Sequence, residues 1–369
     1  MKNQIKLETF EDFFNSKVIQ GSSKVKEFCS EIPKGNILVI TTKSSLERDK
    51  VKTLIDNLDV KKCEFYTDVE PNPDLEKLDR AINSLNKGKF NSIIAIGGGS
   101  VMDSAKAIMS FLNLQVKNPL SVHFREGKIL KLKKEFYFAA VPTTSGTGSE
   151  ATPFSTIWDF KYAKKYSLES KLLYPDLVFL NPEVTSTLPF NQTLFPGLDA
   201  TSHALEAIWN RNTNNKTIEI AENSLRLIVN SLPHLMNDLQ NSQYRSMMQE
   251  ASFLAGIAIS RTKTAIAHSI SYPLTSKFNV PHGIACSFTL ASIIDFLEER
   301  DFRFLDKALI VEVKEMLENL NLNKHLNSYI DNEQILSLVD SMYSPERAKN
   351  FYEEISYKDI NDIVNSSLV

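Results

Sequence analysis

The chain has 369 residues, of which 42% are hydrophobic and 24% charged, and its formal net charge is −3. This composition is typical of a globular protein with two domains, and no concentrated basic stripe indicates a nucleic-acid partner. No apolar run approaches the roughly 20 residues that cross a bilayer, and the first residues lack a secretory apolar core. Cys29, Cys63 and Cys286 are scattered and fit neither a disulfide framework nor a thiolate zinc site. We therefore expect a cytoplasmic protein without membrane association.

The first half of the chain alternates short apolar runs with helical patterns. Buried strands are predicted at residues 36–42, 63–69, 92–98, 136–144 and 176–182, with helices at 73–89 and 100–113. Such alternation predicts a parallel, Rossmann-like sheet covered on both faces. From about residue 190, long helix-compatible runs dominate, at 192–210, 215–232, 244–260 and 305–320. We therefore expect an α/β dinucleotide-binding domain at residues 1–187 and an all-helical domain for metal and substrate at 188–369.

Three consecutive glycines, Gly97, Gly98 and Gly99, follow the third predicted strand, and Ser100 opens a helix. Without Cβ atoms the backbone N–H groups can approach an anion, and the helix dipole favours a phosphate there. Taken alone, the turn is equally consistent with a tight strand-to-helix loop, and it is not the usual G-x-G-x-x-G pattern. A second polar run, residues 142–150, follows the next strand and could hold the rest of a dinucleotide.

Four side chains in the second half have the spacing of a divalent-metal site. Asp199 and His203 are four residues apart in a helical pattern, so both project from one face. His268 and His282 are fourteen apart, and the Pro-His-Gly turn can direct the second imidazole back toward the first pair. One carboxylate and three imidazoles suit Fe(II) or Zn(II) with a position left for substrate. The remaining histidines, His123, His234 and His325, have no partner at ligand spacing and are interpreted as ordinary core or surface side chains.

Residues 97–108, 141–152, 197–209 and 267–283, read in this order, resemble the iron-containing (group III) alcohol dehydrogenases. The likeness extends from residue 36 to at least residue 290, and it implies a dehydroquinate synthase-like architecture and an NAD(P)H-dependent aldehyde reductase. Within that family, the stretches at 152–159, 164–170, 173–189, 203–214 and 262–283 look most like the phosphonoacetaldehyde reductase branch, which forms 2-hydroxyethylphosphonate. The resemblance also implies a homodimer.

The resemblance places functional roles on individual positions. It makes Asp199, His203, His268 and His282 the ligands of iron, with zinc as the alternative. It assigns the cofactor to Gly97, Gly98, Gly99, Ser100, Asp103, Thr143, Thr144, Thr147, Lys165 and Leu180. Lys165 is also consistent with a solvated loop charge, and Leu180 with a strand-core residue.

Two departures from the family pattern bear on the chemistry. Many members carry a histidine four residues after the third ligand, where this chain has Tyr272, so the proton would arrive through Tyr272, water or the cofactor ribose. Tyr272 is equally consistent with a packing role before Pro273 interrupts the helix. An acidic residue often follows the first strand in NAD-preferring members, whereas this chain has Thr41, Thr42 and Lys43. The sequence thus permits NADPH, with NADH tolerated, and Thr42 is a candidate cofactor contact.

An anionic phosphonate needs cationic partners beyond its carbonyl group. Arg261 and Lys263, on the same predicted helical stretch as His268, are the candidates, and Arg211 is a weaker one. All three are also consistent with charges exposed to solvent.

Three alternatives remain. One is a short-chain alcohol or diol dehydrogenase of the same family, of the butanol, 1,3-propanediol or lactaldehyde type, which would gain nothing from that cationic pair. Another is the related dehydroquinate synthase or glycerol dehydrogenase chemistry, and a third is a regulator that has lost catalysis. The enzymatic interpretation requires the four donor side chains to converge on one point.

Overall fold

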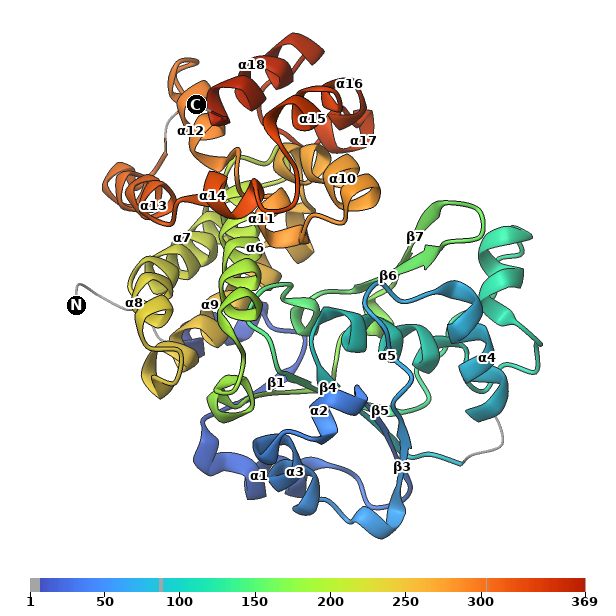
Figure 1. Ribbon diagram of the computed structural model, residues 1–369. Coiled ribbons are helices and arrows are strands. Elements are labelled where there is room, and N and C mark those ends of the chain that lie inside the picture. Colours follow the sequence, from blue (N-terminus) through green and yellow to red (C-terminus); the bar gives the residue numbers. More distant parts are fainter. Residues whose placement is uncertain (1–6, 86–88, 303, 369) are drawn as a thin grey trace. The chain divides into compact units, whose positions relative to one another are not determined.

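The computed structural model describes residues 7–85, 89–302 and 304–368 of the chain. These residues form two compact units (Figure 1). The α/β unit contains Phe13–Thr144 and Ser149–Thr187, and the helical unit contains residues 7–12, Ser145–Gly148 and the chain from Leu188 onward. The sequence analysis assigned residues 1–187 to a single domain, whereas two short stretches of that range group with the helices.

The α/β unit is built on a sheet of six parallel strands in the order β1-β8-β5-β4-β2-β3. The strands are β1 (Lys17–Gln20), β2 (Ile37–Ile40), β3 (Cys63–Tyr66), β4 (Ser92–Gly97), β5 (Tyr137–Pro142) and β8 (Leu177–Leu180). The five predicted strands are confirmed as part of a parallel sheet. The short edge strand β1 was not predicted, because four residues with only two apolar side chains give little periodic signal.

Apolar side chains fill both faces of this sheet. On one face Val39, Ile94 and Phe179 form a core with Phe28 of α1 and Leu54 of α3, and the alternate side chains of the central strands are buried as well. The helices are α1 (Val25–Glu31), α2 (Lys43–Leu46), α3 (Asp49–Asp56), α4 (Leu75–Leu85) and α5 (Gly99–Phe111). Helix α5 packs against β4 and follows it directly, so the glycine turn lies at the carboxyl end of a central strand.

Two parts of the α/β unit differ from the predictions. The strand β3 was expected to be buried, but it lies at the edge of the sheet, where Glu64 and Phe65 are exposed. Residues Phe154–Asp159 (β6) and Lys164–Glu169 (β7) form a separate antiparallel hairpin that was not predicted. The sequence of β6 does not alternate apolar and polar residues, and β7 alternates only over residues 165–169, so neither strand gave a strong periodic pattern.

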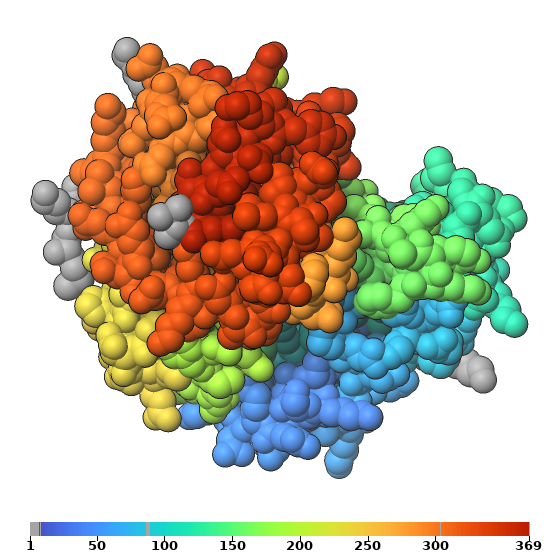
Figure 2. All heavy atoms as spheres, turned by 45° about the horizontal axis from the view of Figure 1, so that its top comes forward, coloured from blue at the N-terminus to red at the C-terminus, as the bar shows by residue number. Residues whose placement is uncertain are grey.

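The helical unit has a central group of long helices, in which α6, α7 and α9 pack against one another. The C-terminal helices form a continuous outer layer of this unit, orange to red in Figure 2. None of the described helices is long and apolar enough to cross a membrane. The helices of the unit are α6 (Phe190–Ile208), α7 (Asn215–Val229), α8 (Leu232–Asn237), α9 (Ser242–Thr262), α10 (Ile266–Phe278), α11 (His282–Ala285), α12 (Leu290–Glu298), α13 (Lys307–Asn319), α14 (Leu322–Leu326), α15 (Asn332–Leu336), α16 (Val339–Met342), α17 (Pro345–Ala348) and α18 (Tyr357–Ser367).

Candidate functional site

Helix α6 carries the first two candidate metal ligands in the interior of the helical unit. Asp199 and His203 lie one turn apart, and their exposed fractions are 3% and 5%. A carboxylate this deeply buried is unfavourable unless cations or strong donors face it. The helix runs from Phe190 to Ile208 through Pro196, within two residues of the predicted run at each end.

Helices α10 and α11 bring the other two imidazoles to the same place. His268 lies near the start of α10, and its exposed fraction is 4%. His282 is the first residue of α11, directly after a proline that begins the turn. A Cβ atom on Gly283 would lie 1.8 Å from the Phe195 carbonyl oxygen of α6, so only glycine allows α11 to approach α6 this closely. The Pro-His-Gly turn thus directs His282 toward Asp199.

One oxygen of Asp199 lies at the centre of the cluster. Its Oδ1 atom is 3.4 Å from Nε2 of His203, 3.6 Å from Nε2 of His268 and 3.8 Å from Nε2 of His282. The rings of His203 and His268 stack with centroids 4.9 Å apart, and His268 meets His282 edge to face at 5.0 Å. The structure therefore brings together the four side chains selected by spacing.

Glu206, one turn after His203, holds His268 in place. Its Oε2 atom is 2.6 Å from His268 Nδ1, and its Oε1 atom accepts a hydrogen bond from the His268 backbone N–H. Burial disfavours the imidazolium, but the carboxylates of Glu206 and Asp199 outweigh burial and raise the pKa of His268 to about 9. When Nδ1–H donates to Glu206, the Nε2 lone pair of neutral His268 faces Asp199.

Burial also disfavours an ionised Asp199, but the three imidazoles outweigh it and hold the pKa of Asp199 below its usual range. The carboxylate therefore remains ionised and available as a donor to a cation.

The sequence analysis missed two residues of this cluster, Glu206 and Cys286. The Cys286 thiol lies 3.6 Å from Asp199 Oδ1, and its Sγ atom belongs to a group of donors with Asp199, His268 and His282 that lie within 4.8 Å of one another. Burial raises the pKa of Cys286 well above its usual value. The signal available in the sequence was spacing: Cys286 is one helical turn from His282, and Glu206 is three residues from His203.

The donor set fits a divalent metal ion. Ligands about 2 Å from a common tetrahedral centre lie about 3.4 Å from each other, close to the distances from Asp199 to the three imidazoles. In the described part of the chain, the buried Nε2 atom of His268 has no hydrogen-bond partner, as expected of an atom that donates its lone pair to a metal. The His282 side chain is 40% exposed, so the cluster is accessible from that side.

The glycine turn of the α/β unit presents backbone groups rather than charges. Gly97 ends β4, Gly98 precedes α5, and Gly99 and Ser100 form its first turn, with Gly98, Gly99 and Ser100 only partly buried. The first backbone N–H groups of this 13-residue helix have no partners within the helix and carry the positive end of its dipole. The turn can therefore bind a phosphate group.

The neighbouring threonines lie at the end of the adjacent strand. Thr143 is buried and donates its backbone N–H to the Gly97 carbonyl, and a Cβ atom on Gly98 would lie 3.0 Å from the Thr144 hydroxyl. Both residues thus belong to the same end of the sheet as the glycine turn. Thr147 is half-buried in the stretch that groups with the helical unit.

Asp103 is engaged in holding the chain together. Its carboxylate accepts hydrogen bonds from the Ser149 hydroxyl and the Thr156 backbone N–H. The fully buried Lys106, one turn further along α5, donates to the carbonyls of Ser149, Thr152 and Phe154. These contacts fix the segment after the second polar loop against α5. The structure thus gives Asp103 a positioning role beside any contact with the cofactor.

The other predicted cofactor residues lie at different places on the α/β unit. Thr42 caps α2, because its hydroxyl accepts the Ser45 backbone N–H. Lys165 is exposed on β7, with its ammonium 5.4 Å from the centre of the Trp158 ring. Leu180 is fully buried at the end of β8, which favours its role in the sheet core.

The expected positions of the cationic candidates were wrong in one respect. Helix α9 ends at Thr262, Lys263 has a φ angle of +64°, and α10 begins at Ile266, so Arg261 and Lys263 do not share a helix with His268. Both side chains are exposed. The Arg211 guanidinium donates to the Phe351 carbonyl at 2.7 Å and is thereby engaged in packing.

Tyr272 lies one turn after His268 on α10 and is half-buried. The expectation that Pro273 interrupts this helix was wrong, because α10 continues to Phe278. Pro273 is the eighth residue of α10, and Tyr272 therefore lies within the helix.

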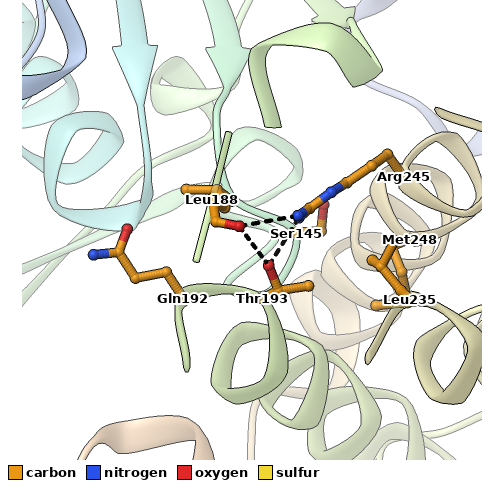
Figure 3. Close-up of a pocket in the computed structure, with 7 residues that line it drawn as sticks. All are labelled: Ser145, Leu188, Gln192, Thr193, Leu235, Arg245 and Met248. Atoms are coloured by element: carbon orange, nitrogen blue, oxygen red, sulfur yellow. Dashed lines mark hydrogen bonds between the residues drawn. The ribbon is translucent and has the colours of Figure 1, made fainter. Parts of the chain in front are cut away.

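A small pocket of the helical unit lies at the start of α6. None of the residues that line it belongs to the histidine cluster. Buried Arg245 of α9 donates to the Leu188 carbonyl and the Thr193 hydroxyl, as Figure 3 shows. The pocket therefore belongs to the packing that fixes α6 against α9. Its lining consists of Ser145, Leu188, Gln192, Thr193, Leu235, Arg245 and Met248.

The sequence matches two family profiles. One, described as iron-containing alcohol dehydrogenase, matches residues 15–182, and the other, described as the C-terminal part of the Fe-containing alcohol dehydrogenase family, matches residues 193–368. Together they contain all the residues of the histidine cluster and of the glycine turn.

Characterised relatives share about a third of the residues. An aldehyde-alcohol dehydrogenase of Streptococcus pneumoniae is 29% identical over 70% of this chain and 31% of its own length. A 1-propanol dehydrogenase of Salmonella typhimurium is 32% identical over 63% of this chain and 58% of its own length. The match thus spans less than two thirds of the length of either relative.

Among solved structures, the sulfoacetaldehyde reductase of Bifidobacterium kashiwanohense, in complex with NAD+, superposes with a TM-score of 0.83. It is 27% identical, and the match covers 96% of this chain and 97% of that one. An iron-containing alcohol dehydrogenase of Thermotoga maritima is also 27% identical, with a TM-score of 0.76, over 96% of this chain and 98% of that one.

Proposed function

Because the chain belongs to the iron-containing alcohol dehydrogenase family, we propose that it reduces a small aldehyde to a primary alcohol with NADPH or NADH. The reaction consumes one reduced nicotinamide and one proton for each carbonyl group. The observation that carries this proposal is the convergence of Asp199 Oδ1 with the Nε2 atoms of three histidines. No other role explains a buried carboxylate facing three imidazoles as directly.

In this proposal Asp199, His203, His268 and His282 hold Fe(II), or Zn(II) in its place. A divalent ion at this position would polarise the aldehyde carbonyl as a Lewis acid and stabilise the negative charge that develops on its oxygen. The protein itself holds the donor side chains in position for the ion. Glu206 fixes the ring orientation and tautomer of His268, and the close contact of Gly283 with α6 fixes His282.

The α/β unit would bind the dinucleotide, which supplies the hydride from the reduced nicotinamide. We assign the diphosphate to the N–H groups of Gly98, Gly99 and Ser100, whose helix N-terminus favours an anion. The positions after β2 contain no carboxylate that would repel a 2′-phosphate. Thr41 donates to the Ile96 carbonyl, Thr42 caps α2, and exposed Lys43 is left to pair with a phosphate, so we propose that NADPH is accepted.

Tyr272 is the proposed route for the proton, together with water and the cofactor ribose. It is half-buried and one helical turn from His268, and its neutral hydroxyl can donate a hydrogen bond to the alcohol oxygen as it forms. We also propose a cytoplasmic homodimer, by analogy with the family.

The substrate that we propose is phosphonoacetaldehyde. The similarity to a sulfoacetaldehyde reductase over nearly the whole chain supports an aldehyde that carries an anionic group two bonds from its carbonyl carbon. The similarity to a 1-propanol dehydrogenase supports the alternative, a short-chain alcohol or diol dehydrogenase.

An aldehyde panel tests the proposal. Protein loaded with Fe(II) or Zn(II) is mixed with NADPH or NADH and with phosphonoacetaldehyde, sulfoacetaldehyde, propanal or lactaldehyde, and the absorbance at about 340 nm is followed. We expect nucleotide oxidation with at least one aldehyde, fastest with the phosphonate. Oxidation with none of them would refute the reductase, and a preference for propanal would select the alternative substrate.

A further inference from the structure

Arg347 of α17 lies beside the helix that carries His268. Its guanidinium carbon is 5.9 Å from the centre of the Tyr272 ring, and its Nη1 atom donates a long hydrogen bond of 3.4 Å to the Thr264 carbonyl. Thr264 and Tyr272 are four residues before and four residues after His268. Tyr272 lies one turn, about 5.4 Å, after His268 on α10, and Thr264 lies in the short link just before α10. Arg347 therefore lies beside the part of α10 that carries His268.

Hydrogen bonds hold the segment that carries Arg347 against α10. The Ser269 hydroxyl, next to His268, donates to the Met342 carbonyl at 2.5 Å and accepts the Ser344 backbone N–H at 2.9 Å. The Asn350 side chain donates to the Thr264 carbonyl at 2.8 Å. Arg347 lies between these anchors, so its position relative to His268 is fixed by contacts on both sides.

The positive charge of Arg347 is not balanced by an acidic side chain among the described residues. Within the described ranges, no carboxylate forms an ion pair with this half-buried guanidinium. Other arginines of the chain differ, since Arg125 pairs with Asp159 and Arg300 pairs with Asp359. A guanidinium has five N–H donors in a planar fork that suits oxyanions, and among the residues that the structure describes only one long hydrogen bond, to Thr264, uses them.

We propose that Arg347 binds the anionic end of the substrate, a phosphonate or sulfonate group, and so selects charged over neutral aldehydes. The proposal rests on the proposed function and replaces Arg261 and Lys263, which are separated from His268 by the break between α9 and α10. The Tyr272 ring contacts the Arg347 guanidinium and lies one turn after His268 on α10, so this residue connects the proposed anion site to the helix that carries a metal ligand.

The test compares charged and neutral aldehydes in the metal-loaded protein. In Arg347→Gln we expect kcat/KM for phosphonoacetaldehyde and sulfoacetaldehyde to fall about 10- to 100-fold, mainly through KM, as expected for the loss of a charge-assisted hydrogen bond. The value for propanal should change by about twofold or less. Arg347→Lys should restore part of the preference, because it keeps the charge without the fork. The ratio of the two charged substrates in the parent protein tells which anion is preferred.

Asn350→Ala is the matched control, because it removes the other side-chain donor to the Thr264 carbonyl. If Arg347 only supports that turn, both variants will affect charged and neutral aldehydes alike, and the proposal is wrong. Lys263→Gln should leave the preference unchanged, and a loss of selectivity there would return the role to Lys263.

A binding measurement separates this proposal from the reductase itself. Calorimetric titration with 2-hydroxyethanesulfonate and 2-hydroxyethylphosphonate should show binding to the parent protein that weakens by a similar factor in Arg347→Gln. Weakened binding without reduction of any aldehyde would support the anion site and refute the reductase. Reduction of aldehydes with no charge preference and no effect of Arg347→Gln on binding would keep the reductase and overturn the anion site.

Discussion

The candidate site of the helical unit is made of side chains, whereas that of the α/β unit is made largely of backbone groups. In the helical unit one carboxylate and three imidazoles converge, two of the imidazoles almost fully buried. In the α/β unit a turn of three glycines exposes backbone N–H groups, and the nearby charged residues Asp103 and Lys106 are engaged within the protein. The comparison predicts that the histidine cluster is lost when a donor side chain is removed. The glycine turn, in contrast, is lost when a side chain is added over its backbone N–H groups.

Asp199→Asn should have the largest effect. The amide keeps the shape but removes the negative charge that faces three imidazoles, so we expect most of the metal to be lost and activity to fall by about 1000-fold or more. Binding of NADPH, followed by its fluorescence, should persist because the proposed diphosphate site is backbone. Metal is measured by mass spectrometry after dialysis.

His234→Ala is the control for this variant, since His234 lies in the same unit, on α8, and stacks on Tyr244 of α9. Full metal content in Asp199→Asn would contradict the assignment of the site.

Glu206→Gln tests whether the partner of His268 matters as much as the ligands. The amide would weaken the contact with Nδ1 and the preference for one tautomer, so we expect metal affinity to fall about 10- to 100-fold. Competition with a chromophoric chelator measures this affinity. An unchanged affinity would show that the packing of α10 alone orients His268.

Gly98→Ala makes the converse change in the α/β unit. The added methyl group would lie 3.0 Å from the Thr144 hydroxyl and 3.3 Å from its methyl group, and it would cover N–H groups at the start of α5. We expect the KM for NADPH to rise about tenfold, with metal content unchanged. A loss of metal in Gly98→Ala would mean that the two sites are not independent.

The sequence predicted the two sites unequally well, and the reason is physical. Side-chain donors at helical spacing, such as Asp199 and His203, are visible because a helix fixes the direction of each residue. The strands β2, β4, β5 and β8 were predicted for a similar reason, since they are buried on both faces and therefore continuously apolar.

Contacts between distant segments were not visible. Glu206 and Cys286 join the cluster through the packing of α6 against α10 and α11, and Arg347 meets α10 through a segment about 80 residues later in the chain. The break at Lys263 was missed because a non-glycine residue with positive φ leaves no pattern in the sequence. Local periodicity predicts elements and their faces, but not which faces meet.

The smallest predicted effect concerns stability of the α/β unit rather than either site. The Arg125 guanidinium donates two hydrogen bonds of 2.7 Å to the buried Asp159 carboxylate, and these hold the pKa of Asp159 below its usual value. Because the folded pKa is depressed, the stabilisation is complete above the pKa of an unfolded Asp, about 4, and is lost as the pH falls below it.

Asp159→Asn should lower the free energy of unfolding by about 1–3 kcal/mol at neutral pH. The difference between the proteins, measured by urea unfolding, should shrink below about pH 4. The exposed Asp56, changed to Asn, is the control and should leave the free energy of unfolding at neutral pH nearly unchanged. A constant difference for Asp159→Asn at every pH would mean that shape and not charge provides the stabilisation.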